Sequence, residues 1–402
     1  MALIVQKFGG SSVADAERVF RVAKIITDTY QKGNSVCVVL SAQGDTTDDL
    51  IDKAAEINPD ASRREMDMLL ACGEQISIAL MAMAIEKLGF PVVSLCGWQI
   101  GMQTDANHSS ARIAKVDCDR VREEMDKKRI VLVAGFQGID RHGDVTTLGR
   151  GGSDTTAVAL AVALQADVCQ IYTDVDGVYT SDPRIVPEAR KLEEITYDEM
   201  LELASMGAQV LHNRSVELAK SYGVTLEVLS SFTGNAGTIV KEIVKNVEKT
   251  YITGVAQDKK IARFALVGLE DVPGVAYKLF NLLAKGKINV DMIIQSLGHD
   301  ERKDIIFTVA DKDVMACAKL LDDNKDSLKF DHMDINTGVS KVSIVGAGML
   351  ENAGVAARMF EALYQAHINI HMISTSEIKV SVLIDKEDSD RAVRLIHNQF
   401  FQ

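Results

Sequence analysis

The sequence contains few prolines, few aromatic residues and no excess of positive charge. Of its 402 residues, 5 are proline and 5% are aromatic, while 47% are hydrophobic and 25% are charged. This composition is that of a globular protein and excludes a disordered or collagen-like chain. Lys and Arg number 44 against 57 Asp and Glu, which gives a net charge of -13. A general nucleic-acid binder needs the opposite overall sign, so we expect no nucleic-acid partner.

Long apolar runs and closely spaced cysteines are also missing. No uninterrupted apolar run exceeds eight residues (residues 157–164), whereas a membrane-spanning helix needs about 20, so we expect no transmembrane helix and no membrane partner. Residues 1–8 show no basic region followed by an apolar stretch, so we expect no secretory signal. The six cysteines lie 22 or more residues apart, which predicts reduced core thiols in a cytoplasmic protein.

Up to residue 245, apolar strands alternate with helices. The strand at residues 35–41 is apolar throughout, and the segment after Asp15, its expected N-cap, has apolar residues at helical spacing. We expect further strands at residues 3–5, 91–95, 130–134, 168–172 and 225–229, and helices at 64–88, 117–128, 155–164, 195–206 and 215–222. Strands without polar alternation, separated by helices, predict a mainly parallel sheet covered on both faces, in one α/β domain over residues 1–245.

An internal repeat follows a linker around residues 242–249. Nine of the twenty positions from 274 to 293 are identical at an offset of 80, beginning with Gly-Val-Ala in both copies. This period is too long for a solenoid repeat and indicates a domain duplication. We expect two βαββαβ units, at residues 262–335 and 340–402.

The first candidate site element follows the first strand. Gly9 and Gly10 let backbone N–H groups approach an anion closely, and Lys7 adds a positive charge, with Ser11 beside it. The pattern is not GxxxxGK[ST], so a Walker A loop is excluded. The alternative is an ordinary glycine turn beside a solvated lysine.

The second element is the segment from Gly149 to Asp154, which precedes an apolar helix. Glycines at a strand-to-helix turn place free N–H groups at a helix N-terminus, which favours a phosphate. Arg150 offers a bidentate fork for a carboxylate. The alternative for Asp154 is a favourable charge in the first helical turn.

Two further elements carry polar residues in suggestive places. The first is the segment of Thr173, Asp174 and Tyr179, followed by Arg184 after a proline; these residue types could hold a ribose and an adenine. The alternative is an ordinary polar loop. Glu74 follows a glycine and opens an apolar helix; a buried glutamate needs a partner such as a substrate ammonium, and the alternative is a surface acid at a helix start. Strand ends in open α/β sheets are where ligands bind.

Taken together, these motifs resemble the amino acid kinase family, and within it the aspartokinases. The resemblance rests on residues 7–13, Ser41 with residues 44–48, Gly73-Glu74, residues 149–154, 173–179 and 182–184, and covers essentially the whole chain. The repeat resembles two ACT regulatory domains, and residues 373–377 (ISTSE) are typical of the second ACT domain of aspartokinases. The implied fold is a three-layer α/β sandwich followed by two ferredoxin-like domains.

The resemblance implies that the β-carboxylate of L-aspartate attacks the γ-phosphate of MgATP, giving L-4-aspartyl phosphate and ADP. Phosphoryl transfer depends on positioning and charge neutralisation, and Mg²⁺ would be bound mainly through the nucleotide phosphates, with few protein ligands. The resemblance implies that the transferring phosphoryl group is held by Lys7, Gly9, Gly10 and Ser11, and that Lys7 is oriented by Asp154. Aspartate would be bound by Ser41, Thr47, Glu74 and Arg150. The nucleotide would be bound by Thr173, Asp174, Tyr179 and Arg184.

The resemblance also implies regulation by lysine, threonine or both, as part of lysine and threonine biosynthesis. The implied effector residues are Asp271, Gly274, Ala276, Asp291 and Gln295 in the first ACT unit and Asn369, Ile370 and Thr375 in the second, most of which have an alternative as turn or core residues. Pairing of ACT units between chains predicts a homodimer or a higher oligomer.

One departure from the family pattern leaves rival interpretations open. Gln209 stands where many aspartokinases carry a lysine near the nucleotide phosphates. A kinase for another amino acid, such as glutamate, keeps the fold, and a catalytically inactive amino-acid sensor keeps the ACT units. The retained Lys7, Arg150, Asp154 and Arg184 argue against the sensor. A dehydrogenase is disfavoured because no GxGxxG follows a strand.

Overall fold

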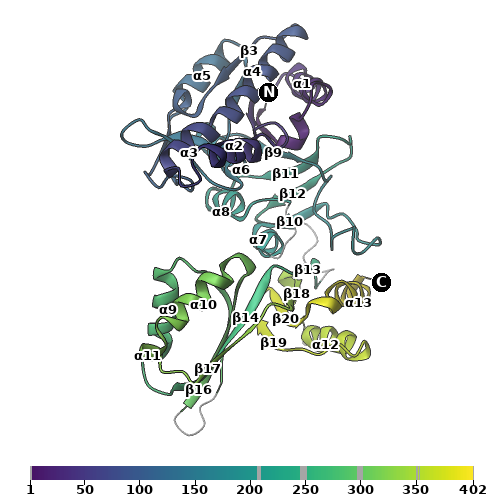
Figure 1. The fold of residues 1–402 in the computed structure, drawn as a ribbon. Helices are drawn as coiled ribbons and strands as arrows, with labels where there is room; N and C mark the ends of the chain where they lie inside the picture. The colour runs from purple at the N-terminus through teal and green to yellow at the C-terminus, as the bar shows by residue number, and fades with distance from the viewer. Residues whose placement is uncertain are drawn as a thin grey trace. The chain divides into compact units, whose positions relative to one another are not determined.

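A computed structural model describes residues 2–205, 210–244, 251–296, 302–349, 352 and 354–401. The chain divides into two compact units (Figure 1). The described part of the first unit consists of residues 2–179, 191–205 and 210–244. The second unit combines Thr180–Arg190 with the described residues from 251 onward.

The first unit is built on an eight-stranded sheet in which most neighbouring strands are parallel. In spatial order its strands are β10 (Glu194–Thr196), β12 (Thr238–Lys241), β11 (Leu226–Ser230), β9 (Val168–Thr173), β1 (Leu3–Phe8), β2 (Ser35–Leu40), β6 (Ile130–Ala134) and β3 (Val92–Leu95). Only β11 and β12 pair in the antiparallel sense. This confirms the predicted mainly parallel α/β fold.

Helices cover both faces of this sheet, which makes three layers (Figure 1). In β2, Val36, Val38 and Leu40 face the layer of α1 (Ala16–Gln31) and α4 (Cys72–Lys87). On the other face, α6 (Gly152–Leu164) packs against β1, β2 and β9 and is buried almost all round. The remaining helices are α2 (Thr46–Ile57), α3 (Arg63–Leu70), α5 (Asp119–Asp126), α7 (Tyr197–Ser205) and α8 (Asn213–Tyr222). Asp15 caps α1 as predicted, accepting from the backbone N–H of Arg18.

A second, smaller sheet in the first unit was not predicted. Its strands are β5 (Ile113–Val116), β4 (Met102–Thr104), β7 (Gln137–Ile139) and β8 (Val145–Thr147), in that order. Each has three or four residues. Strands this short present too few positions for an alternating pattern to be recognised in the sequence.

The long helix predicted at residues 64–88 is divided. The helices α3 and α4 meet at Ala71, which lies between them and donates its N–H to Asp67. By length and composition alone, the stretch Arg63–Lys87 is long and apolar enough to cross a membrane. This stretch contains no long uninterrupted apolar run, because Gly73, Glu74 and Gln75 interrupt its apolar residues. A core helix of a globular protein passes the same test, and α4 packs against α1, β3 and β6.

The helix predicted at residues 195–206 begins later than expected. Residues 194–196 form the edge strand β10, and α7 starts at Tyr197. The reason is local, because the hydroxyl of Thr196 accepts from the N–H of Glu199 and donates to its carboxylate, which fixes the helix start. All six cysteines are free, and Cys37, Cys118, Cys169 and Cys317 are buried as predicted, whereas Cys72 is exposed and Cys96 half-buried.

The second unit contains the predicted duplication as two four-stranded sheets, each covered by helices. The first copy comprises β14 (Ile261–Glu270), α9 (Val275–Lys285), β15 (Val290–Gln295), β16 (Arg302–Ala310), α10 (Val314–Asp322), α11 (Lys325–Leu328) and β17 (His332–Asn336). The second comprises β18 (Val339–Val345), α12 (Val355–Gln365), β19 (Met372–Thr375), β20 (Lys379–Asp385) and α13 (Ser389–Phe401). Gly274 and Gly354 precede their helices with nearly equal φ values of 95° and 97°.

The second copy differs from the predicted βαββαβ unit at one edge. Where β17 pairs with β14 in the first copy, β13 (Gly254–Asp258) pairs with β18 in the second. That strand precedes the whole first copy in sequence and lies outside the predicted range of residues 340–402. Val255 of β13 is buried in the core of the second copy, where Val186, from the Thr180–Arg190 segment, also packs.

We predict that Val255→Asp loosens the second copy alone, because it buries a charge in that core. In hydrogen–deuterium exchange on the full chain, amides of β18 and β20 should exchange faster, while those of β16 keep the rate of the unaltered protein. Tyr277→Asp, on an exposed position of α9, is the control. Equal acceleration in β16 and β18 would contradict the assignment of β13 to the second copy.

Candidate active site

The centre of the candidate site is an ion pair between a strand and a helix. Lys7, near the end of β1, places its ammonium 2.7 Å from a carboxylate oxygen of Asp154, in the first turn of α6, and each side chain is 12% exposed. The turn before α6 requires glycine at position 151, where φ is 69° and an added Cβ would lie 2.2 Å from the ring of His212. Asp154 is therefore held at the helix start, where its charge is also favoured by the helix dipole.

The glycine turn after β1 lies against the loop after β2. An added Cβ at Gly10 would lie 2.5 Å from the carbonyl oxygen of Ala42, whereas at Gly9 it would lie 3.5 Å from the Lys7 ammonium and 4.0 Å from the carbonyl oxygen of Tyr172, which are ordinary contact distances. The N–H of Gly44 donates to the carbonyl of Gly10. Of the two predicted glycines, Gly10 is thus required for close backbone approach, while Gly9 borders Lys7. Ser11 follows them and is exposed.

Glu74 is buried and only partly satisfied. It is 3% exposed, and one carboxylate oxygen accepts from the backbone N–H of Ala42 at 3.1 Å. The other oxygen is buried without a partner among the described residues. Burial raises the pKa of Glu74 to about 7. A buried carboxylate with a free oxygen is chemically suited to an ammonium ligand.

The other predicted aspartate-binding residues lie on neighbouring segments. Ser41 follows β2 and donates its N–H to the carbonyl of Phe8 in β1. Thr47 is half-buried in the first turn of α2. The residue before it, Thr46, lies close to Gly73, because a Cβ added at Gly73 would be 3.6 Å from the Thr46 methyl group. Arg150 is exposed, and none of the described residues bonds to its guanidinium.

Thr173 is the last residue of β9, which is the neighbour of β1 in the sheet, and Asp174 follows it. The Thr173 hydroxyl is engaged locally with the backbone of Val175, and Asp174 is exposed. The position of these residues beside Gly9 follows from the register, which pairs Tyr172 with Phe8.

Tyr179 has a partner that the sequence did not reveal. Its hydroxyl donates to Asp176 at 2.6 Å, and the same carboxylate accepts from Asn235 at 2.9 Å and pairs with Lys191 at 3.3 Å. These donors lower the pKa of Asp176 to about 2. The network joins segments about 60 residues apart along the chain (Asp176 and Asn235), which explains why sequence spacing did not indicate it.

Arg184 belongs to the second unit, where it pairs with Asp182 at 2.7 Å and its side chain is 88% exposed. Gln209 lies outside the described residues. In the part of the chain that the structure describes, no three His, Cys, Asp or Glu side chains gather as a metal-binding group.

A supporting carboxylate was also missed. Asp67 is fully buried in α3 and accepts from the N–H of Ser109 and from both the N–H and the hydroxyl of Thr147. Leu148, the residue after Thr147, is held by Arg214, whose guanidinium donates a hydrogen bond to the Leu148 carbonyl at 3.0 Å. These bonds fix the backbone leading to Arg150. Nothing in the sequence marks Asp67, since an acid in a polar helix is normally exposed.

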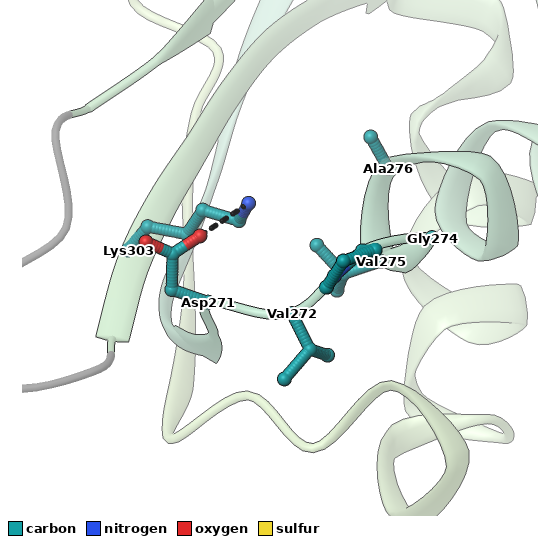
Figure 2. Close-up of a pocket in the computed structure, with 7 residues that line it drawn as sticks. Asp271, Val272, Gly274, Val275, Ala276 and Lys303 are labelled. Carbon is teal, nitrogen blue, oxygen red and sulfur yellow. Dashed lines mark ion pairs between the residues drawn. The ribbon is translucent and has the colours of Figure 1, made fainter.

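The predicted effector residues separate in the structure. Asp271, Gly274 and Ala276 line one cavity of about 420 Å³ at the start of α9, with Lys303 of β16 beside them (Figure 2). Asp291 does not line this cavity and forms an ion pair with Lys341 of β18. The remaining candidates also lie outside it: Gln295, Asn369 and Thr375 are exposed, and Ile370 packs against the core of the second copy.

We predict that Gly10→Ala lowers the unfolding free energy by about 1–3 kcal/mol, the usual cost of forcing an extra carbon into packed structure. Thermal unfolding would measure the change. Gly9→Ala is the matched control and should unfold like the unaltered chain, since its added carbon stays at ordinary contact distance, 3.5 Å or more, from every neighbouring atom given for it. Equal destabilisation by both substitutions would refute the assignment of the close approach to Gly10.

Comparison with known proteins identifies the family of the chain. The model of the amino acid kinase family matches residues 2–230, and that of the ACT domain matches residues 264–324 and 342–400. An aspartokinase of Mycolicibacterium smegmatis is 51% identical over 405 aligned residues, which cover 100% of this chain and 96% of the relative. An aspartate kinase of Pseudomonas putida is 48% identical over 401 aligned residues, covering 100% and 98% of the two chains.

A solved structure of a relative extends the likeness to three dimensions. Aspartokinase III of E. coli in complex with aspartate and ADP has a TM-score of 0.82 and 26% identity, with 100% of both chains covered. The family models, the sequence identity over the full length and the similar fold all lead to one assignment. The chain is a phosphotransferase that belongs to the amino acid kinase family, among the aspartokinases with C-terminal ACT domains.

Proposed function

We propose that the protein transfers the γ-phosphate of ATP to the β-carboxylate of L-aspartate. A carboxylate oxygen forms a bond to the γ-phosphorus, the bond from that phosphorus to the β,γ-bridging oxygen breaks, and ADP leaves with the electron pair. The nucleophile is already an anion, so no proton is removed. The observation that carries the proposal is the buried, unpartnered oxygen of Glu74, which suits the α-ammonium of an amino acid. The E. coli relative solved with aspartate and ADP supports this substrate pair.

Two anions must meet in this reaction, so the main task of the site is to offset their repulsion. We assign this task to Lys7, whose ammonium would contact the transferring phosphoryl group, helped by the N–H groups of Gly9 and Gly10 and by Ser11. Asp154 is the positioning partner that holds Lys7, at 2.7 Å, on the strand side of the site. Mg²⁺ would arrive bound mainly to the phosphates of ATP and supply further neutralisation.

Aspartate would be held through three kinds of contact. Glu74 would take its ammonium, Arg150 would clamp a carboxylate in a bidentate manner, and Ser41 and Thr47 would donate hydrogen bonds. The exposure of Arg150, and the absence of a described partner for it, leave its five donors available.

The nucleotide would lie over the end of β9, at Thr173, Asp174 and Tyr179. The hydroxyl of Tyr179 already donates a hydrogen bond to Asp176. We therefore propose that the ring of Tyr179, rather than its hydroxyl, contacts the nucleotide. The Asp176 network would hold that ring in place. Arg184 belongs to the second unit. We keep it as a proposed contact with the nucleotide.

For regulation, we propose that the cavity at Asp271, Gly274 and Ala276 binds an amino-acid effector, with lysine, threonine or both inhibiting the enzyme. Asp291, Gln295, Asn369, Ile370 and Thr375 stay candidates for effector contacts outside this cavity. E. coli aspartokinase III has been solved in complex with lysine and aspartate, at a TM-score of 0.76 and 26% identity, which supports an amino-acid effector. We further propose a cytoplasmic homodimer, or higher oligomer, joined through the ACT domains.

We predict that Lys7→Ala lowers kcat by about 100-fold or more, because one charge-stabilising donor is typically worth that much. The variant should still fold, with a lower melting temperature because Asp154 loses its partner. Steady-state ADP release with MgATP and L-aspartate would measure kcat, and circular dichroism the fold. Lys24→Met, at an exposed position of α1, is the control for loss of a lysine and should keep full activity. Normal turnover by Lys7→Ala would remove Lys7 from the mechanism.

The raised pKa of Glu74 predicts a pH dependence of aspartate binding. Below about pH 7 the free enzyme holds Glu74 protonated, and the neutral acid does not attract an ammonium. The KM for aspartate should therefore rise as the pH falls from 8 to 6. Glu74→Gln should raise KM by about tenfold at pH 8 and remove this pH dependence, since a buried charge-assisted bond is lost.

Stability separates this role of Glu74 from a purely structural one. The native pKa lies above the value of about 4.3 expected in the unfolded chain, so ionisation of Glu74 opposes folding progressively as the pH rises from about 4.3 to 7. Glu74→Gln should thus gain melting temperature relative to the unaltered protein as the pH increases from 5 to 8. A variant that loses both stability and aspartate binding at every pH would contradict the proposal.

A further inference from the structure

The effector cavity carries its own cation. Lys303, near the start of β16, places its ammonium 2.8 Å from the Asp271 carboxylate, and its side chain is only 9% exposed against 44% for Asp271. Figure 2 shows the two side chains next to each other, across from the first turn of α9 with Gly274 and Ala276. A lysine this deeply buried is held by its partner and cannot turn away into solvent as a surface lysine would.

The neighbouring charges do not compete for this pair. Arg302 pairs with Asp331 at 2.6 Å, and Lys329 pairs with Glu270 at 3.0 Å. Among the described residues that line the cavity, Asp271 is thus the one carboxylate and Lys303 the one ammonium. In this described lining the two charges cancel, with one of each sign.

The opposite side of the cavity adds donors without charge. The helix α9 begins at Gly274 with no side-chain cap and no acidic residue in its first turn. Unfilled N–H groups at a helix start favour a carboxylate. An amino-acid zwitterion could therefore place its carboxylate between α9 and Lys303, and its α-ammonium against Asp271, so that each charge meets its opposite.

We propose that Lys303 is a specificity-determining residue, which makes this cavity select amino acids with a neutral side chain over cationic ones such as lysine. This inference rests on the proposed effector role of the cavity. With the α-ammonium on Asp271, the described lining residues offer no second carboxylate for a basic side chain. Lys303 repels that side chain, and the repulsion is strong because the ammonium of Lys303 is shielded from water.

The test uses the full-length protein and three probes: L-threonine, L-lysine and L-norleucine, a neutral amino acid with a side chain similar in length to that of lysine. Hydrogen–deuterium exchange of the peptide spanning residues 269–279 reports occupancy of this cavity, and its dependence on probe concentration gives the Kd. Lys303→Met removes the charge at similar side-chain length, and Lys303→Arg is the matched control that keeps it.

In the unaltered protein, the better neutral probe should bind at least tenfold more tightly than lysine. Lys303→Met should bring this ratio close to one or invert it, because Asp271 loses its internal partner and attracts cations. Lys303→Arg should leave the ratio unchanged. Lysine binding as tightly as the neutral probes in the unaltered protein, or a ratio unaffected by Lys303→Met, would overturn the role of Lys303. If no probe protects the peptide in any variant, the cavity is not an effector site, and the proposed effector role fails together with this inference.

Discussion

The ion pair between Lys7 and Asp154 is the constraint on which the rest of the catalytic unit depends. It joins β1, in the middle of the large sheet, to the buried helix α6, and both partners are largely removed from water. Loss of one partner would leave an uncompensated charge in the protein. The strands on either side of β1 bring the loop after β2 and Thr173 to the same edge, so the pair lies where the glycine turn, Glu74 and the β9 strand end converge.

Much of the fold could be predicted because its elements are long and strongly patterned. The continuous apolar strands and the repeat at an offset of 80 predict the parallel sheet and the duplication. The small sheet of β4, β5, β7 and β8 was not predictable, because strands of three or four residues carry little periodicity. The pairing of β13 with β18 of the second copy was not predictable either, because the entire first copy separates the two strands in the sequence.

The candidate site divides in a similar way. Lys7, Gly10, Glu74 and Asp154 lie in or next to short glycine-containing segments at the ends of strands or the starts of helices, so the local sequence suggested them as site residues. Asp67, Asp176 and Lys303 were missed, because their importance comes from partners far along the chain: Thr147, Asn235 and Asp271. An isolated acid or lysine in a sequence looks like a surface residue, and only burial and pairing distinguish it. Of the eight predicted effector residues, three line the cavity at the start of α9: Asp271, Gly274 and Ala276.

The most direct test of this account is to trap the reaction product of the unaltered protein with hydroxylamine, in the presence of MgATP and L-aspartate. An acyl phosphate on the β-carboxylate reacts with hydroxylamine to give aspartyl hydroxamate, in amounts that match the ADP released. The account predicts hydroxamate that requires aspartate and is not formed when L-glutamate replaces it. Folded protein that forms no hydroxamate from aspartate, or that forms it equally from glutamate, would contradict the proposed reaction.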